Sequence, residues 1–289
     1  THVDPLFGPG INIHRHPLNG RNFEYFSEDP ILAGRMAAAY VRGIQKNGIS
    51  ACPKHFAVNS QELRRMASDS VLDERTLREL YLTGFEIVVK EAKPKTIMTS
   101  YNLINGTYAN ENAHLLQDIL RKDWGFDGAV VTDWGGSNDH ALGVKNGSTL
   151  EMPCPGGDSI RELMKAVQDG KISEADVDAR LDEMLELVLS THTAVEKAPR
   201  TFDAAAHHKL ARRAAAESIV LLRNEGGILP LKPNEKLAVI GDFAETPRYQ
   251  GAGSSAVNAL QVDTLLDSIK ADDSGITLVG YASGFERQG

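Results

Sequence analysis

The side chains best suited to chemistry follow directly after short apolar segments that are typical of buried strands. These positions belong to Lys54, His55, Tyr101, Asp133 and Trp134. An ammonium and an imidazole can donate hydrogen bonds, a carboxylate can attack an electrophile, and an indole offers a flat apolar wall. In a (β/α)8 barrel, residues that follow strands share one face, where the loops build the active site.

Each of these residues also has a purely structural interpretation. Asp133 could cap a following helix, because an aspartate after a strand is by itself weak evidence of chemistry. Lys54 could be solvated beside a histidine that is satisfied in the core. Tyr101 and Trp134 could be packing residues. The residue types and their positions therefore make these five residues candidates for a site. Whether their side chains lie close together depends on the surrounding strands and helices.

The first 190 or so residues alternate short β-rich segments with amphipathic helices, a rhythm typical of parallel strands joined by crossover helices. Strands are expected at residues 48–52, 96–100 and 128–132. Fewer than eight clear strand–helix units can be counted. We therefore predict an α/β fold of the (β/α)8 TIM-barrel type that is either incomplete at its N-terminus or irregular.

Helix boundaries are marked by capping residues. Asp29 is suited to the N-cap and Pro30 to the first helical position of a helix that ends at Asn47-Gly48. The spacing predicts that this helix buries the following residues: Leu32, Met36, Ala39, Tyr40 and Gly43.

Two later helices have similar start signals. Ser159 is expected to cap a helix that buries Ile160, Leu163, Met164 and Val167 and closes at Gly170. Ser173 opens the next one, with Asp176 in the capping-box position and Ile172 placed to pack against Val177.

The helical pattern lapses at residues 191–200, and clean strand patterns return at residues 237–241 and 277–280. We predict a barrel domain at 1–195, a linker at 196–212 that runs into a helix at 204–216, and at 213–289 the beginning of an αβα sandwich domain. The second domain is expected to be barely begun at Gly289.

Composition excludes several classes of function. The 289 residues include 42% hydrophobic and 24% charged residues, as in soluble globular proteins. A net charge of −8 argues against a nucleic-acid partner, which requires a basic face. No apolar run approaches the ~18 residues that span a bilayer, so no membrane association is expected. The two cysteines, Cys52 and Cys154, are expected to be free buried thiols, with a disulfide as the alternative.

Several segments in order along the chain resemble glycoside hydrolase family 3. They are residues 8–17 (GPGINIHRHP), 20–24 (GRNFE), 27–30 (SEDP), 53–56 (PKHF), 98–102 (MTSYN), 105–106 (NG), 124–128 (WGFDG) and 131–134 (VTDW). Past the linker, residues 215–222 (AAESIVLL) and 229–231 (LPL) resemble the start of the family's second domain. The likeness covers nearly the whole chain.

The resemblance implies a retaining hydrolase that releases terminal β-D-glucosyl residues, with Asp133 as the nucleophile that forms a covalent glycosyl-enzyme. In such enzymes a second carboxyl group, ~5–5.5 Å away, protonates the leaving oxygen. Lys54 and His55 would donate to sugar hydroxyls, and the charge of Lys54 would keep Asp133 ionised. Arg15 would bind the sugar, while Arg21 and Glu24 would form a structural ion pair.

The remaining pocket residues follow from the same likeness. Tyr101 would hydrogen-bond the nucleophile, and Trp134 would form an aromatic wall against the sugar. Ser254 lies in a glycine-serine loop that resembles the loop extended by the second domain toward the substrate. Thr149 stands where many relatives have aspartate, which puts the local pocket wall in doubt.

No glutamate in this chain matches the family's acid/base, so the remainder of the same polypeptide is expected to supply it. Residues 57–62 lack the histidine loop of the N-acetylglucosaminidase branch, which favours β-glucosidase, with β-xylosidase or a non-catalytic sugar-binding fragment as alternatives. No cofactor or metal is expected, since His14 and His16 lack other metal-ligating company. A β-glucoside or oligosaccharide is the expected substrate. Homodimer formation and the cellular compartment stay open.

Overall fold

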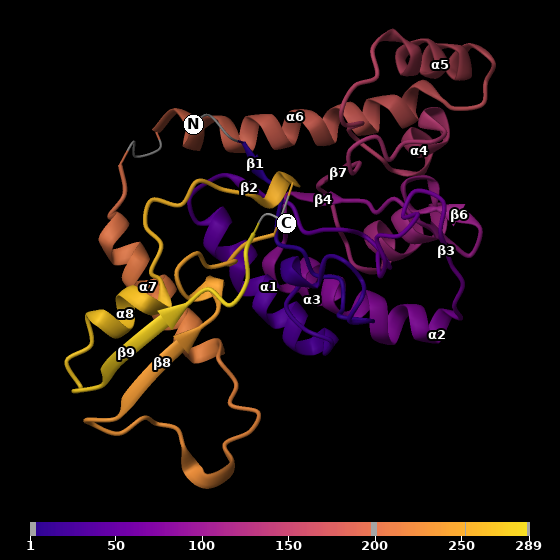
Figure 1. Ribbon diagram of the computed structural model, residues 1–289. Helices are drawn as coiled ribbons and strands as arrows, with labels where there is room; N and C mark the ends of the chain where they lie inside the picture. Colours follow the sequence, from indigo (N-terminus) through magenta and orange to yellow (C-terminus); the bar gives the residue numbers. More distant parts are fainter. Residues whose placement is uncertain (1–3, 198–200, 252, 288–289) are drawn as a thin grey trace. The chain divides into compact units, whose positions relative to one another are not determined.

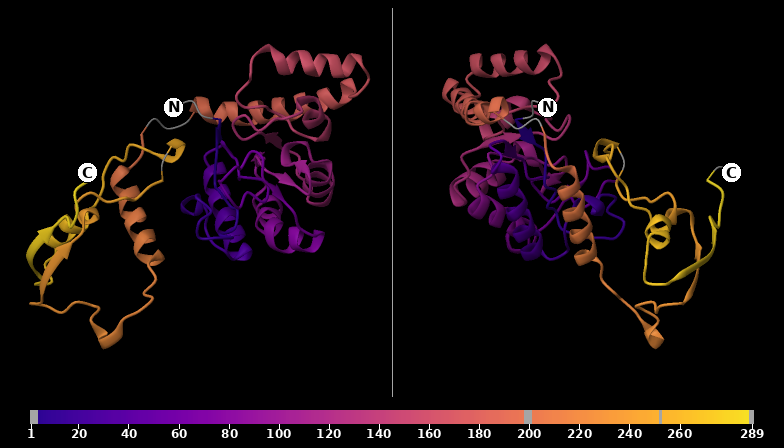
Figure 2. Two further views of the ribbon diagram at one scale, coloured as in Figure 1. Left: turned by 45° about the vertical axis from the view of Figure 1, so that its right-hand side comes forward. Right: turned by 90° about the vertical axis from the view of Figure 1, so that its left-hand side faces the viewer.

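The computed structural model describes residues 4–197, 201–251 and 253–287. The chain divides into two compact units, residues 1–198 and 199–289, which can be followed by colour in Figures 1 and 2. Each is an assembly of strands and helices. The first of these, unit 1, contains all of the predicted site residues except Ser254. The second is called unit 2.

Unit 1 is built on short parallel strands. β1 (Pro5–Leu6) pairs with β2 (Ser50–Ala51), and β4 (Thr96–Met98) pairs with β7 (Ala129–Val131). Parallel bridges extend this arrangement between Gly10 and Lys54, Phe56 and Thr99, and Val131 and Leu150. Every residue of β2, β4 and β7 is buried, as expected for strands covered by crossover helices. The observed class is therefore α/β, and the three strand positions predicted from the sequence are confirmed.

The other elements of unit 1 connect or cover these strands. The helices are α1 (Pro30–Gln45), α2 (Glu74–Thr76), the π-helical η2 (Leu77–Leu82), α3 (Thr83–Ala92), the π-helical η4 (His114–Asp123), α4 (His140–Asn146), α5 (Gly157–Gln168) and α6 (Glu174–Lys197). Short 3-10 turns occur at η1 (Asn22–Glu24) and η3 (Ala109–Glu111), and a small outlying sheet contains β3 (Asp69–Ser70), β5 (Leu103–Ile104) and β6 (Thr107–Tyr108).

Helix α1 begins as predicted but buries a different face. The Asp29 carboxylate accepts hydrogen bonds from the backbone N–H groups of Ile31 and Leu32, which confirms the N-cap. The buried residues, however, are small: Ala33, Gly34, Ala37, Ala38 and Val41. The predicted core residues Leu32, Met36 and Tyr40 are about half exposed. The prediction of the buried face was wrong.

Close packing of α1 on α3 explains that difference. A Cβ atom placed on Gly34 would lie 2.9 Å from the side chain of Ile87 and 3.1 Å from the Gly84 Cα atom. The two backbones approach so closely that only small residues fit between them. Apolar periodicity identifies a stripe of large side chains, but here the inward face is mostly alanine and glycine.

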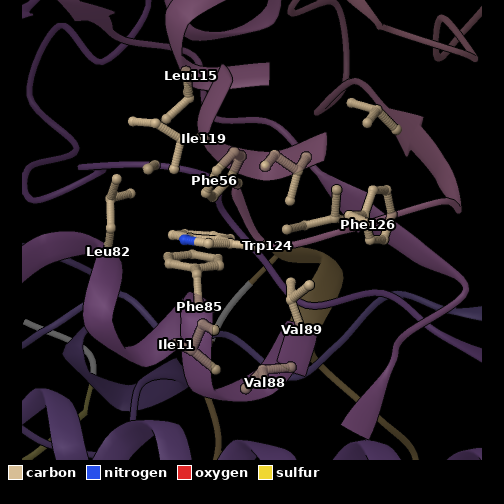
Figure 3. Close-up of a cluster of buried hydrophobic side chains, with 14 of the residues drawn as sticks. Ile11, Phe56, Leu82, Phe85, Val88, Val89, Leu115, Ile119, Trp124 and Phe126 are labelled. Carbon is tan, nitrogen blue, oxygen red and sulfur yellow. The ribbon is translucent and has the colours of Figure 1, made fainter. Parts of the chain in front are cut away.

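An aromatic cluster fills the core between these helices and the strands. Phe56 lies edge-on to both Phe85 and Trp124, with ring centroids 5.1 and 5.8 Å apart. Figure 3 shows the Trp124 indole beside the Phe85 ring, with Leu115 and Ile119 nearby. Since Phe56 directly follows His55, packing of this ring fixes the backbone that carries Lys54 and His55.

The starts of helices α5 and α6 were predicted with different success. α5 starts at Gly157, so Ser159 lies inside the helix and does not cap it, and Ile160 and Met164 are exposed. For α6 the predicted capping box is confirmed, because Ser173 and Asp176 exchange hydrogen bonds between side chain and backbone. Ile172 and Val177 pack in one cluster, also as predicted.

Helix α6 continues to Lys197, past the point where the sequence pattern lapses. The buried Thr191 hydroxyl bonds to the Leu187 carbonyl oxygen and to the Asp4 carboxylate, so a polar residue replaces an apolar one on the inner face. Residue 195 and the start of the expected linker are thus helical up to 197. None of the helices in the described ranges is long and apolar enough to cross a bilayer.

Both cysteines are free, but only one is buried. Cys52 is inaccessible, and burial raises the pKa of its thiol to about 12. Cys154 is exposed, which corrects the expectation that both thiols are buried. Thr149 joins a partly buried polar network: its hydroxyl lies 2.5 Å from Glu183, which pairs with Arg121 and Arg180. Its side chain therefore has a structural role.

Unit 2 contains a parallel pair, β8 (Lys236–Ile240) and β9 (Thr277–Ala282), which confirms both predicted strands. Its helices are α7 (Ala204–Ser218) and α8 (Leu265–Lys270), with short turns at η5 (Glu225–Gly227), η6 (Asp242–Ala244) and η7 (Gly253–Ser255). Helix α7 matches the predicted helix and occupies part of the segment 196–212 expected to be a linker. A small cluster around Val239 and Leu266 forms the core.

Candidate active site

Asp133 lies two residues beyond the end of β7, among the loops that follow the parallel strands. One carboxylate oxygen, Oδ1, accepts a 2.8 Å hydrogen bond from the Trp134 backbone N–H. The other, Oδ2, lies 3.4 Å from Nε2 of His55. The side chain is 15% exposed, so it is sheltered but reachable. A carboxylate held in this way has little rotational freedom and keeps one oxygen directed toward its neighbours.

His55 is held by both its backbone and its ring. The Asn12 side-chain amide bonds to the backbone N–H and carbonyl oxygen of His55 at 2.7 and 2.9 Å. The Tyr25 hydroxyl lies 3.2 Å from Nδ1. Burial first, and then the positive charges of Arg21, Lys54 and Arg65, hold the pKa of His55 well below its ordinary value. His55 is therefore a neutral imidazole beside Asp133.

A neutral imidazole carries one N–H, and this links the two contacts of Nε2. Arg21 Nη2 lies 3.2 Å from Nε2 and can only donate. If Nε2 carries no proton it accepts from Arg21, and the protonated Nδ1 then donates to the Tyr25 hydroxyl. If Nε2 carries the proton it donates to Asp133, and Nδ1 then accepts from the Tyr25 hydroxyl. The protonated nitrogen of His55 is consequently set by which partner Nε2 engages.

Arg21 is the arginine whose side chain contacts the His55 ring. It makes a two-pronged ion pair with Glu24 at 2.7 and 3.2 Å and lies 3.7 Å from Glu62. Burial alone would lower the pKa of Arg21, but the hydrogen bond to Glu24 and the nearby acidic groups raise it overall. The predicted ion pair is confirmed. Its contact with His55, which brings it to the candidate site, was missed.

The structure puts Arg15 elsewhere. Its Nε donates to the Tyr81 hydroxyl at 2.8 Å, its side chain is exposed, and it lines a separate cavity. Among residues 4–197 no hydrogen bond or ion pair joins Arg15 to Lys54, His55 or Asp133. The expectation that Arg15 converges with those residues was wrong. Both arginines stand in the same motif, so only the folded loop separates their roles.

Lys54 is close to the site, with a different partner from the one expected. Its Nζ lies 3.9 Å from Oε2 of Glu24, and within the described part of unit 1 no ion pair joins it to Asp133. Glu24 thus sits between Lys54 and Arg21 and orients both. Two donor groups, one ammonium and one guanidinium, are thereby fixed at the same edge of the site.

Tyr101 supports the backbone after Asp133. Its hydroxyl donates to the Trp134 carbonyl oxygen at 2.8 Å and also lies within hydrogen-bonding reach of the Asp133 side chain, as predicted. Burial, with the negative charge of Asp133, raises the pKa of Tyr101 to about 12. The Arg65 guanidinium lies 4.4 Å from the ring centroid and pairs with Glu62. Tyr101 is therefore a neutral clamp on the loop that carries Asp133.

The sequence matches family models over both units. Residues 1–187 match the glycosyl hydrolase family 3 N terminal domain, and residues 219–275 match the glycosyl hydrolase family 3 C-terminal domain. The first match alone covers well over half of the chain. The chain belongs to glycosyl hydrolase family 3.

Similar proteins carry two different activity names. The chain is 46% identical over 284 residues to thermostable beta-glucosidase B of Acetivibrio thermocellus, covering 98% of this chain and 37% of that protein. It is 45% identical to an exo-alpha-(1->6)-L-arabinopyranosidase of Bifidobacterium longum, covering 98% and 38%. The structure of beta-glucosidase 3B from Thermotoga neapolitana in complex with glucose is similar with a TM-score of 0.89 at 40% identity, covering 96% and 39%. The chain thus spans a little over a third of the length of these family 3 relatives.

Two predicted site residues are exposed, each within its own unit. The Trp134 side chain is 59% exposed, which leaves the indole face open to a ligand. Ser254 lies in η7 of unit 2 and is exposed. Within the described residues no group of three His, Cys, Asp or Glu side chains is arranged to hold a metal ion.

The buried position of His55 predicts that its ring stays uncharged at pH values where exposed histidines are protonated. We expect NMR of the His ring to show His55 uncharged well below pH 6.5, with a matched control in the exposed His114. Hydrogen bonding to Glu74 raises the pKa of His114, so that ring should gain its proton above pH 6.5. Because unfolded chains protonate His55 near its ordinary pKa, stability should fall as the pH drops below about 6.5. A His55 ring that titrates at or above pH 6.5 would contradict the assignment of a neutral buried imidazole.

Proposed function

We propose that the protein hydrolyses β-glucosides with retention of configuration and that Asp133 is the nucleophile. The position of the Asp133 carboxylate, beside His55 and beyond the end of a buried parallel strand, is the observation on which this proposal rests. A carboxylate in the retaining route attacks the anomeric carbon, displaces the aglycone and forms a covalent glycosyl-enzyme, which water then hydrolyses. Family membership supports the same reaction class.

The surrounding side chains have distinct parts in this proposal. His55, Lys54 and Arg21 would bind sugar hydroxyls through fixed N–H groups, with Arg21 taking the part first expected of Arg15. A site with buried, oriented hydrogen-bonding groups rejects ligands that lack the matching hydroxyl. Tyr101 would hold the Trp134 backbone, and the exposed indole would stack on an apolar sugar face. Ser254 would be a further substrate contact.

The reaction also requires a carboxylic acid that protonates the leaving oxygen. We assign it to a glutamate of the same polypeptide beyond Gly289, in keeping with the family resemblance. The same resemblance supports a (β/α)8 barrel for residues 1–195, to which the parallel pairs β1–β2 and β4–β7 would belong. In that barrel Lys54, Tyr101 and Asp133 would follow successive strands on one rim.

The similarity to the Bifidobacterium longum arabinopyranosidase supports α-L-arabinopyranosides as a second class of substrate. An α-L-arabinopyranoside has the ring stereochemistry of a β-D-galactoside without its hydroxymethyl group, so the nucleophile could act identically on it. The substrates differ only in groups at C4 and C5. Preference would therefore be set by the side chains that face those carbons.

Substrate preference can be measured with 4-nitrophenyl glycosides that share one leaving group. We expect the highest kcat/KM on the β-D-glucoside, with lower values on the β-D-xyloside and the α-L-arabinopyranoside. A loss of roughly 10-fold or more is expected for each missing or misoriented hydrogen-bonding group. A higher kcat/KM on the α-L-arabinopyranoside than on the β-D-glucoside would make α-L-arabinopyranosides the preferred substrates.

The nucleophile assignment predicts that Asp133→Asn in the full-length protein lowers kcat by roughly 10,000-fold or more, because an amide cannot form the glycosyl ester. The fold should survive, since the two side chains have the same shape. Mass spectrometry after treatment with a 2-fluoroglucoside should locate the label on the peptide containing residue 133. A label on another carboxylate, or near-normal turnover by the variant, would refute the assignment.

The two arginines provide a matched pair. Arg21→Ala should lower kcat/KM by about 10- to 100-fold, the effect of losing a charged hydrogen bond worth about 1.5–3 kcal/mol. Arg15→Ala removes the same charge from the same loop and should leave kcat/KM within about twofold. Thermal unfolding of both variants controls for misfolding, since Arg21 also neutralises Glu24 and Glu62. An equal loss in both variants would contradict the distinction between them.

A further inference from the structure

Glu111 is a buried carboxylate outside the set of side chains assigned to the sugar. It ends the short turn η3, which follows β6, and it is only 4% exposed. Burial raises the pKa of its carboxyl group, which means that this position is costly for a negative charge. Acidic side chains are almost never this buried unless they are paired. In the described ranges no ion pair joins Glu111 to a basic side chain, so hydrogen bonds have to stabilise it.

The hydrogen bonds of Glu111 lead to the loop that follows β7. Its Oε1 accepts from the backbone N–H groups of Asn138 and Asp139 at 2.8 and 3.1 Å. A single carboxylate oxygen therefore holds the far end of this loop, just before α4 begins. The Glu111 carbonyl oxygen accepts from the side-chain amide of Asn146 at 2.7 Å, which ties the other end of α4 to the same turn.

The turn that contains Glu111 is itself attached to the buried strands. Oδ1 of the neighbouring Asn110 accepts a hydrogen bond from the Thr99 hydroxyl at 3.1 Å. Thr99 directly follows β4, and its backbone N–H donates to the carbonyl oxygen of Val131 in β7 at 2.9 Å. The Glu111 carboxylate is therefore a fixed point to which a loop can be held.

The near end of the loop carries Asp133 and Trp134, and it closes in a tight turn. The Gly136 N–H donates to the Asp133 carbonyl oxygen at 2.9 Å, and the Gly135 N–H donates to the Met152 carbonyl oxygen at 2.7 Å. A Cβ atom placed on Gly136 would lie only 3.1 Å from that Asp133 oxygen. Because the turn is so closely packed, a shift of its far end is passed back to Asp133.

We propose that Glu111 is a positioning residue for the nucleophile, which sets the place of the Asp133 carboxylate and the Trp134 indole by holding the far end of their loop. The inference rests on the proposed hydrolysis and extends it to a side chain that does not touch the sugar. A misplacement of about 1 Å caused by a distant substitution can cost about 100-fold in rate. The donors assigned to the sugar hydroxyls lie on other loops, so sugar binding should depend much less on Glu111.

Two variants of the full-length protein test the acceptor itself. Glu111→Met keeps the length of the side chain without an oxygen, and it should lower kcat on 4-nitrophenyl β-D-glucoside by about 10- to 100-fold. Glu111→Gln keeps an oxygen that can accept from both N–H groups, so its kcat should stay within about fivefold of the parent value. The inhibition constant of glucose should change by less than about threefold in both variants, because ground-state binding is retained.

Glu183→Met is the matched control for loss of stability. Glu183 is another largely buried carboxylate, but it pairs with Arg121 and Arg180 and not with the loop after β7. Its removal should lower the melting temperature, since it breaks a buried ion pair, yet leave kcat within about twofold. A loss of kcat in this control as large as in Glu111→Met would reduce the effect to destabilisation and overturn the positioning role.

Hydrogen–deuterium exchange of the backbone amides of residues 138 and 139 reports the anchor without any turnover. Exchange there should be at least about 10-fold faster in Glu111→Met than in the parent protein and in Glu111→Gln. Parent-like exchange in Glu111→Met, or a normal kcat despite faster exchange, would overturn the inference. An equal loss of kcat in Glu111→Met and Glu111→Gln would do the same, because the acceptor would then be irrelevant.

Should circular dichroism show that Glu111→Met does not fold, Glu111→Asp takes its place. The shorter side chain keeps the charge but withdraws the oxygen from the two N–H groups, so kcat should fall at least about fivefold. An unchanged kcat in that variant would count against the positioning role. A parent protein that hydrolyses no aryl glucoside would refute only the proposed function, since the exchange measurement tests the hold of Glu111 on the loop by itself.

Discussion

A guanidinium that is taken out of water requires carboxylates around it, and this requirement organises the loops above the strands. Arg21 is held between Glu24 and Glu62, and both carboxylates have further partners: Lys54 on Glu24 and Arg65 on Glu62. Breaking a buried ion pair by removing one partner is far more costly than losing a surface pair. The two loops that contribute these residues, one after β1 and one after β2, are therefore fixed relative to each other before any ligand binds.

The neutral state of His55 follows from the same concentration of charge. Burial removes the water that could solvate an imidazolium, and the positive charges of Arg21, Lys54 and Arg65 disfavour it further. The positive potential is shared with Asp133, which has one oxygen on the Trp134 backbone and the other toward His55. This geometry supports the proposed reaction, in which the Asp133 carboxylate attacks while its neighbours donate or accept hydrogen bonds.

Much of this arrangement could be predicted from the sequence, because strand ends and helix starts have local signals. The apolar segments at residues 48–52, 96–100 and 128–132 identified the strands, and the Asp29 cap and the Ser173–Asp176 box identified two helix starts. The family motifs identified Asp133 and its immediate neighbours as a set. Their convergence was an inference from parallel topology, and the contact of His55 with Asp133 agrees with it.

The errors share a physical cause, which is that pairing depends on the folded path of the chain. Arg15 and Arg21 have the same chemistry and lie six residues apart in one loop, so nothing local distinguishes the one that reaches His55. The inner face of α1 escaped detection because Gly34 and the alanines beside it carry little hydrophobic signal, yet allow the closest helix approach. The predicted contact of Tyr101 with Asp133 is present, but the bond of the same hydroxyl to the Trp134 carbonyl oxygen was missed because no residue type marks a backbone partner.

The unequal settings of the two thiols have a practical consequence. Cys52 has no accessible surface, whereas Cys154 is exposed and lies two residues from Met152, whose carbonyl oxygen accepts a hydrogen bond from Gly135 in the loop after Trp134. Thiol-reactive reagents modify an accessible sulfur and leave a shielded one untouched. A maleimide dye on this chain would accordingly attach at one place, where its emission would follow movements of the segment that carries the indole without any engineered cysteine.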